Sequence, residues 1–223
     1  MNNLKSEIKH LLILLFICLY GCKSKQECPE KINVLPMYGG VEKCEQQIDN
    51  DNDFILESEQ QFKSKKEASE YYVSKGWEHY YANNHDVSMK RFNQAWLLDE
   101  KNPEVYWGFG NLLGKNSEFE KSITYFLTSI EIEPGNAKVY ESISTSYGQL
   151  FLKTKNVDYL DLTIENLKKA IKIDPKNGRI HGQLAASYSY FIQKDSLRNY
   201  IKLTDEIDPK FINPEIRKIL EEE

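Results

Sequence analysis

Histidine and cysteine are the residue types in this sequence that could do chemistry. The four histidines are His10, His79, His85 and His181, and none has a second metal-binding side chain at helical spacing. No serine lies in a nucleophile elbow, and no glycine-rich loop precedes a predicted helix. The many carboxylates fall in patterns that are typical of solvated helix faces. We therefore expect no enzymatic activity, no metal and no cofactor, and chemistry that is limited to the cysteines.

The cysteine at position 22 follows an unbroken apolar run over residues 11–20, which comes after Lys5 and Lys9. Ten residues of helix span about 15 Å, roughly half of a bilayer core. The run therefore predicts an export signal over residues 1–21 rather than a membrane span. The segment Leu19-Tyr20-Gly21-Cys22 resembles the lipobox of bacterial lipoproteins, although a residue smaller than Tyr20 is commoner in the third position from the end.

This resemblance implies cleavage after residue 21 and diacylation of the Cys22 sulfur, which would anchor the mature chain in a membrane. The other interpretation is an ordinary signal peptide followed by a chance cysteine. Lys23 stands where an aspartate would retain a lipoprotein in the inner membrane. We therefore expect a lipid-anchored protein of the cell envelope, in the outer membrane and facing the periplasm.

Cys28 and Cys44 would share the oxidising compartment that export implies. If they pair, they close a loop of about 17 residues, and the chain-entropy model gives roughly 3 kcal/mol of stabilisation for such a loop. Free thiols are the alternative. A metal site is disfavoured, because two cysteines without a nearby histidine supply too few ligands.

The segment 22–58, which contains these cysteines, differs in composition from the rest of the chain. Prolines and glycines interrupt any helix between residues 29 and 40, and residues 49–53 form the acidic run DNDND. We interpret the segment as a linker between the lipid surface and a folded domain over residues 59–223. Residues 53–72 either extend the first helix of that domain or add a short lead-in helix.

The overall charge argues against a nucleic-acid partner. The net charge of the chain is −5, whereas phosphate backbones require clustered lysine and arginine. Charged residues make up 28% of the chain and apolar residues 40%, which is typical of a folded domain with a solvated surface.

The domain repeats itself at an interval of 34 residues. Pairs of identical residues that are 34 positions apart include Gly76 and Gly110, Phe92 and Phe126, and Pro175 and Pro209. The interval from Pro134 to Pro175 is 41. Its excess of 7 is close to two helical turns, so it can lengthen helices without rotating their apolar faces.

This pattern resembles the tetratricopeptide repeat (TPR), a hairpin of two helices. The resemblance implies an all-α fold, a right-handed superhelix of about four hairpins over residues 69–102, 103–136, 137–177 and 178–211, and a cap helix within 212–223. Lys75, His79 and His181 depart from the motif, and we expect the two histidines to be packed or half-buried. The positions that match it include Tyr72, Gly76, Phe92, Ala95, Tyr106, Gly110, Phe126, Pro134, Tyr140, Tyr147, Ala170, Pro175, Leu184, Ala185, Tyr188 and Pro209.

In TPR proteins, the first helices of the hairpins line a concave face that binds a protein or peptide. Aromatic residues gather in the N-terminal half of this face, and exposed aromatic side chains are common anchors of interfaces. The other interpretation is that they pack under residues 53–68. Gly148 and Gly182 would leave the later groove open or allow close approach of a backbone. Carried over by position, the partner-binding residues are Trp77, Tyr80, Tyr81, Trp107, Asn111, Lys115, Glu141, Thr145 and Tyr190.

These features predict an interaction scaffold or assembly factor that binds a protein or peptide in the cell envelope. The groove lacks the paired basic residues with which some TPR domains hold a peptide carboxylate. The alternative function is a lipoprotein that binds a glycan or a small peptide through the aromatic groove.

Overall fold

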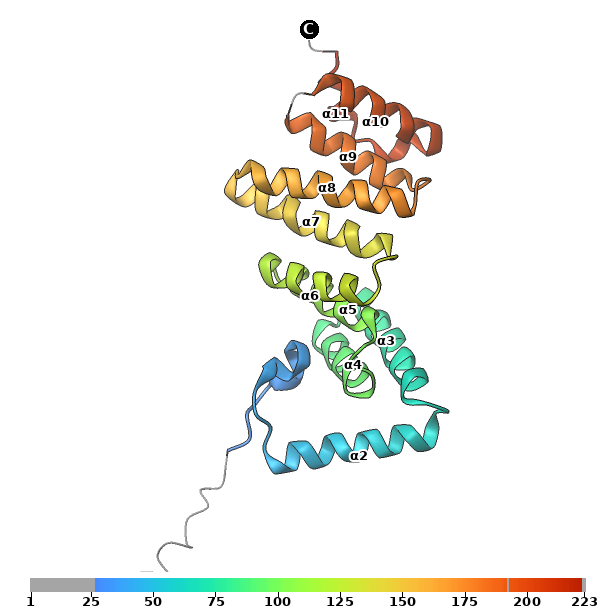
Figure 1. Cartoon of the computed structure of the whole chain (residues 1–223). Coiled ribbons are helices and arrows are strands. Elements are labelled where there is room, and N and C mark those ends of the chain that lie inside the picture. The colour runs from blue at the N-terminus through green and yellow to red at the C-terminus, as the bar shows by residue number, and fades with distance from the viewer. Residues whose placement is uncertain (1–26, 192, 222–223) are drawn as a thin grey trace, which may run out of the picture.

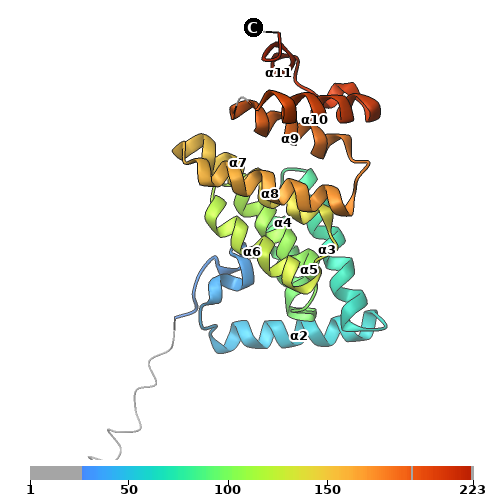
Figure 2. The same cartoon turned by 45° about the horizontal axis from the view of Figure 1, so that its top comes forward.

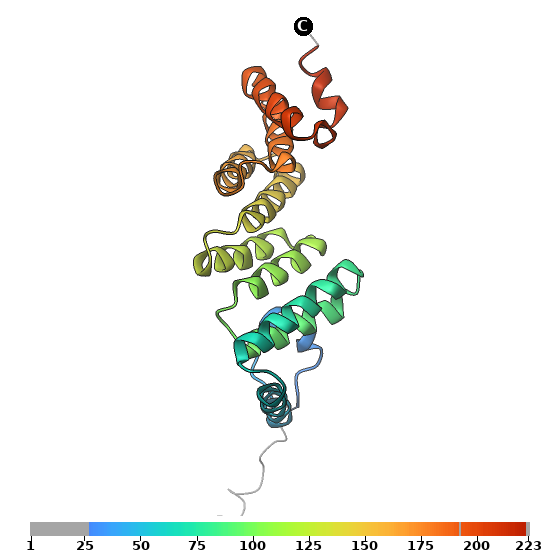
Figure 3. The same ribbon diagram turned by 90° about the vertical axis from the view of Figure 1, so that its right-hand side faces the viewer.

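The structure is a computed structural model that describes residues 27–191 and 193–221. Over these residues the chain forms α-helices and short 3-10 turns, and no strand. The helices pair into hairpins that stack from α2 at one end to α11 at the other (Figure 1). Successive hairpins are rotated relative to one another (Figures 2 and 3). The predicted all-α array of helical hairpins is therefore confirmed.

One hairpin corresponds to each predicted repeat. The third is the longest, because α7 and α8 contain 18 and 17 residues, whereas α5 and α6 contain 13 and 14. The 41-residue interval thus lengthens both helices of one hairpin, as the sequence predicts. The pairs are α3 (Lys65–Tyr81) with α4 (His85–Leu98), α5 (Pro103–Lys115) with α6 (Phe119–Ile132), α7 (Ala137–Thr154) with α8 (Val157–Ile173), and α9 (Gly178–Tyr190) with α10 (Lys194–Ile207).

Asparagine side chains start the first helices of two central hairpins. The side-chain oxygen of Asn102 accepts a hydrogen bond from the backbone N–H of Glu104, and that of Asn136 accepts one from Lys138. These caps satisfy backbone donors that have no partner within the helix. Pro103 occupies the first turn of α5, where its missing N–H costs nothing.

Phenylalanine rings lie directly on helix backbones in the core. Phe92 and Phe126 occupy equivalent positions in successive hairpins, and both are buried. A Cβ atom added to Gly76 would lie 2.6 Å from the Phe92 ring, and one added to Gly108 would lie 2.5 Å from it. A Cβ atom on Gly110 would lie 2.4 Å from the Phe126 ring. Glycine at these positions therefore sets how closely the helices approach.

The C-terminal segment closes one end of the stack. It contains η3 (Pro209–Phe211) and α11 (Pro214–Lys218), which is shorter than the predicted cap helix. Ile216, Ile219 and Leu220 pack with buried Ile212 against α9 and α10. A Cβ atom on Gly182 would lie only 2.4 Å from the carbonyl oxygen of Phe211. The groove is therefore covered rather than open at Gly182, and of the two expectations for this glycine the close backbone approach is correct.

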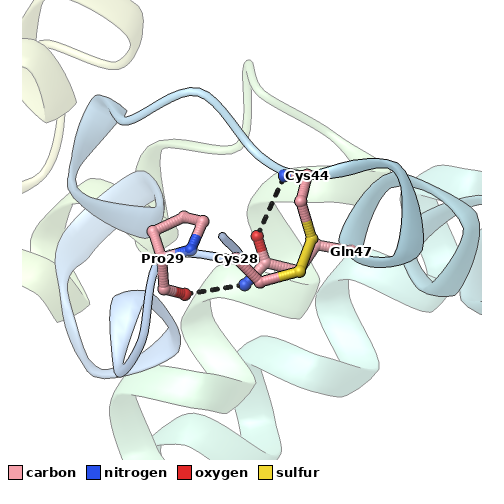
Figure 4. Close-up of a disulfide and its surroundings, with 4 residues drawn as sticks. All are labelled: Cys28, Pro29, Cys44 and Gln47. Atoms are coloured by element: carbon pink, nitrogen blue, oxygen red, sulfur yellow. Dashed lines mark hydrogen bonds between the residues drawn. A yellow bond between two sulfur atoms is a disulfide. The ribbon is translucent and has the colours of Figure 1, made fainter. Parts of the chain in front are cut away.

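The linker expected over residues 22–58 is wrong for the described part, residues 27–58. This part folds into η1 (Ile32–Val34), η2 (Pro36–Gly40) and most of α2 (Glu45–Gln61), so the acidic run lies inside a helix. Cys28 and Cys44 form a disulfide beside the start of α2 (Figure 4). Gln47 reinforces this closure, because its side-chain oxygen accepts from Cys44 N and its amide nitrogen donates to the Pro29 carbonyl.

Contacts with α4 hold the segment in place. The buried amide of Asn93 donates to the carbonyl oxygens of Asn33 and Leu35, at 3.0 and 2.8 Å. Tyr38 packs against Trp96 with ring centroids 6.5 Å apart. The sequence carries no periodic signal of these contacts, because they join turns to a helix that lies about 60 positions later.

The expected signal peptide over residues 1–21 and the expected lipidation site Cys22 lie outside the described residues. Among the helices that the structure does describe, none has the length and hydropathy required to cross a bilayer.

Candidate protein-binding groove

The first helices of the hairpins, α3, α5, α7 and α9, supply one face of the stack. Two depressions follow this face, one of about 430 Å³ between α5 and α7 and one of about 270 Å³ between α7 and α9. Thr145 and Gln149 line both, so the depressions are continuous. We call this surface the groove; its lining includes Tyr80, Asn111, Lys115, Thr145, Gln149, Gln183 and Tyr190.

An aromatic cluster occupies the N-terminal end of the groove. The rings of Trp77 and Trp107 have centroids 4.4 Å apart. Tyr80 meets Trp77 edge-on at 5.3 Å, and Tyr81 stacks on Trp77 at 6.1 Å with an interplanar angle of 29°. Tyr81 is 74% exposed, whereas Trp77, Tyr80 and Trp107 are half-buried. The structure thus brings together the four aromatic residues that the repeat pattern placed there.

Part of this cluster also supports the fold. Trp77 contacts the buried ring of Phe92 at 5.2 Å, so one face of the indole belongs to the core. The Trp107 indole N–H donates to the Ser142 hydroxyl at 2.9 Å, which links α5 to α7. Aromatic side chains that are held on one side and exposed on the other lose little conformational entropy on binding, and this property suits them to anchor a partner.

Cations lie over the aromatic cluster. Lys115 Nζ is 5.7 Å from the centroid of the Tyr80 ring, and Lys138 Nζ is 5.8 Å from that of Trp107. Neither lysine forms an ion pair within the described residues. Glu104 lies at the same end, where burial raises the pKa of its carboxyl group, an effect that Trp77 and Lys138 oppose. The surface here combines aromatic faces with positive charge.

An ion pair between a buried carboxylate and an exposed arginine lies further along the groove face. Glu141 of α7 is 6% exposed and accepts a hydrogen bond from Arg179 Nη2 of α9 at 2.7 Å. Burial raises the pKa of Glu141, and the Arg179 charge opposes this shift. Since a buried carboxylate that already has a cation partner has little left for a ligand, we assign Glu141 a role in joining two hairpins.

The remaining predicted residues lie at different distances from the aromatic cluster. The Asn111 amide donates to the Trp107 carbonyl at 2.8 Å, and Thr145 donates to the Glu141 carbonyl at 3.0 Å, so both keep an acceptor oxygen for a partner. Tyr190 is 57% exposed and packs edge-on against Phe151 at the far end of the groove. It therefore belongs to the second depression rather than to the aromatic cluster.

The alternative expectation for the aromatic cluster, burial under residues 53–68, does not hold. Phe54 and Phe62 of this lead-in segment contact Tyr72, at centroid distances of 5.2 and 6.5 Å, and Phe62 also contacts Tyr71. These tyrosines lie on α3 but do not line either depression of the groove. Among the described residues, the ring contacts of Phe54 and Phe62 therefore go to Tyr71 and Tyr72 and not to the cluster around Trp77 and Tyr81.

His181, one of the departures from the repeat motif, is buried as the sequence predicts. Its Nε2 atom lies 2.9 Å from the Pro175 carbonyl, and its ring packs at 6.2 Å from Tyr200. His79 is half-buried. Across residues 27–191 and 193–221, no three histidine, cysteine or acidic side chains are grouped so that they could hold a metal ion.

Comparison with known proteins agrees with this geometry. Residues 103–136, the second predicted repeat, match the family model of the tetratricopeptide repeat. No curated protein matches the chain.

Several solved structures resemble the fold. TTC0263, a thermophilic TPR protein of Thermus thermophilus, is 19% identical with a TM-score of 0.55, over 68% of this chain and 79% of its own. MamA is 19% identical with a TM-score of 0.54, over 64% of this chain and 79% of its own. The APC/C hetero-tetramer Cut9–Hcn1 has a TM-score of 0.57 at 14% identity, over 68% of this chain and 29% of its own. The chain therefore contains a tetratricopeptide repeat over residues 103–136, and its stack of hairpins has the fold of these solved structures, one of which is a TPR protein.

Proposed function

We propose that this protein is a lipid-anchored scaffold of the bacterial cell envelope that holds a protein partner in its groove. The observation that carries this proposal is the aromatic cluster of Trp77, Tyr80, Tyr81 and Trp107, which is fixed from below by the core and exposed above. TPR domains bind protein partners, and the proposal places that activity at this end of the groove. It includes no catalytic role.

The chemistry of the groove favours a partner segment with an apolar or aromatic anchor and a nearby acidic group. The anchor would pack on Trp77 and Trp107, while the acidic group would meet Lys115 and Lys138, which lie over the Tyr80 and Trp107 rings. Further along, Asn111 and Thr145 offer acceptor oxygens to a peptide backbone. The two depressions would then take successive parts of one extended or helical segment.

The membrane part of the proposal depends on Cys22, the last residue of the lipobox-like segment. Diacylation there would leave five residues between the anchor and Cys28, the first cysteine of the disulfide. The groove would then lie close to a lipid surface, with the outer membrane as the proposed location. Replacement of Cys22 by serine should move the chain from the membrane fraction to the soluble fraction, and unchanged membrane association would refute the anchor.

Crosslinking in the envelope followed by affinity capture tests the scaffold proposal. We expect a protein partner with the wild-type chain and its loss with Trp107→Ala, because truncation of an aromatic anchor typically costs about 2 kcal/mol, or about 30-fold in Kd. Leu127→Ala is the matched control, since Leu127 is 47% exposed on α6 and does not line the groove. Capture that survives Trp107→Ala, or that both variants reduce equally, would contradict the proposal.

A glycan is the alternative ligand, and the exposed face of Tyr81 stacked on Trp77 favours it, because sugar rings pack on such platforms. Titration of the chain with envelope oligosaccharides, followed by tryptophan fluorescence, separates the two ligands. Saturable quenching without a crosslinked protein would assign the groove to a glycan. A captured protein without quenching would assign it to the scaffold role.

A further inference from the structure

A polar pocket of about 650 Å³ lies outside the groove, between the disulfide-closed segment, α2 and α4. Its volume exceeds that of either depression of the groove and falls within the range of sites for small ligands. Figure 1 shows the N-terminal segment and α2 beside α4, at the opposite end of the molecule from α11. We call this space the N-terminal pocket.

Positive charge is in excess in this pocket. Four basic side chains line it, Lys31, Lys43, Lys90 and Arg91, against a single carboxylate, Asp51. Asp51 already pairs with Lys43, which also lies over the Tyr38 ring. Within the described residues, Lys31, Lys90 and Arg91 form no ion pair. Since the whole chain has a net charge of −5, this local excess runs against its composition.

The wall of the pocket is held in an unfavourable backbone conformation. Lys31 and Tyr38, which line the pocket, have positive φ angles of 57° and 56°, and so does Met37 of the same segment, with 50°. Residues other than glycine rarely adopt such angles. The Cys28–Cys44 disulfide and the two hydrogen bonds from Asn93 keep the segment in this form. Non-glycine residues in strained conformations that the surrounding structure maintains are concentrated at binding sites.

Apolar side chains complete the lining. Ile32 and Phe54 come from the N-terminal segment and α2, while Val87 and Leu97 come from α4. Tyr38 is buried, and burial together with Asp51 raises the pKa of its hydroxyl group, which therefore stays neutral. The lining of the pocket thus combines cationic and apolar side chains.

We propose that the N-terminal pocket binds a small anionic ligand, with a phosphate or carboxylate group held by Lys31, Lys90 and Arg91 and a compact carbon body packed on Phe54, Val87 and Leu97. Two sources share this chemistry: a free metabolite, or the headgroup of an anionic phospholipid. The site is separate from the groove and does not depend on the proposed scaffold function.

Calorimetric titration of the purified full chain in zwitterionic micelles tests the proposal, with glycerol 3-phosphate and citrate as probes and glycerol as the neutral control. We expect at least one anion to bind, and Lys90→Gln and Arg91→Gln to weaken it about tenfold, because each removes a charged donor. The matched control is Arg198→Gln, which alters an exposed arginine on α10 and should change the affinity by less than about twofold. Absence of anion binding, or equal effects of Arg91→Gln and Arg198→Gln, would overturn the proposal.

Two further measurements refine this test. The double replacement of Cys28 and Cys44 by serine should abolish binding while circular dichroism shows that the helical hairpins remain; retained binding would contradict the role of the strained segment. Short-chain phosphatidylglycerol added to the micelles identifies the source. Displacement of glycerol 3-phosphate assigns the pocket to a lipid headgroup, and undisturbed binding assigns it to a free anion.

Discussion

Replacement of Gly110 by alanine tests the packing on which the stack depends. The added Cβ would lie 2.4 Å from Phe126 Cε1 and 2.5 Å from Cδ1, and the Phe126 ring is 2% exposed, so it has no free space into which to move. Overpacking of a core costs about 1–3 kcal/mol, whereas the better helix propensity of alanine returns about 1 kcal/mol. We therefore expect a net loss of up to about 2 kcal/mol, or a fall in Tm of up to about 6 °C.

The same substitution at Gly148 is the control. The nearest side-chain atom would be Thr163 Oγ1 at 3.8 Å, an ordinary contact, so Gly148→Ala should raise Tm by about 2–3 °C through helix propensity alone. Gly76→Ala, one repeat before Gly110, should lower Tm, because its Cβ would lie 2.6 Å from the Phe92 ring. Thermal unfolding followed by circular dichroism measures all three. An increase in Tm for Gly110→Ala that matches Gly148→Ala would refute the reasoning.

Three other outcomes follow from the described contacts. Reduction of the Cys28–Cys44 disulfide should remove roughly 3 kcal/mol from the closure of the N-terminal segment, so limited proteolysis should cut within residues 27–61 while the hairpins stay intact. Burial raises the pKa of the Glu141 carboxyl group above its ordinary 4.5, and the Arg179 charge opposes this shift. Because the pKa is higher in the folded state, this group stabilises the fold below about pH 4.5. The contribution is lost as the pH rises through the pKa of the folded state. The Tm of Glu141→Gln relative to wild type should accordingly be higher at about pH 7 than at about pH 4. Ile212→Ala should cost about 2–4 kcal/mol and expose the last hairpin to hydrogen exchange before the others, because Ile212 is 3% exposed against α10.

The repeat pattern predicted the hairpins and the groove because both are periodic. Each position in the 34-residue unit meets the same neighbours in the next unit, so Gly76 with Phe92 and Gly110 with Phe126 can be found from spacing alone. The resemblance to TPR proteins placed Trp77 and Trp107 on one face, where the structure has them in contact.

The N-terminal segment could not be predicted in this way, because it is not one of the repeating units and its contacts with the array do not recur along the chain. The position of the segment depends on hydrogen bonds from Asn93, a polar residue of α4 that no repeat pattern marks as a contact. It also depends on the Cys28–Cys44 disulfide, for which the sequence allowed free thiols as the alternative. Composition suggested a linker, since proline, glycine and acidic residues are frequent in it. The segment is folded by individual side-chain bonds, and such bonds leave no periodic pattern in the sequence from which they could be predicted.

Hydrogen–deuterium exchange on the full chain, with and without the partner identified by crosslinking, tests most directly whether the groove is the binding surface. Our account predicts slower exchange in α3, α5 and α7, which carry the aromatic cluster and line the two depressions, and unchanged exchange in α4 and α10, which line neither depression. Protection confined to α4 and α10, with α3 and α5 unaffected, would show that the partner binds outside the groove.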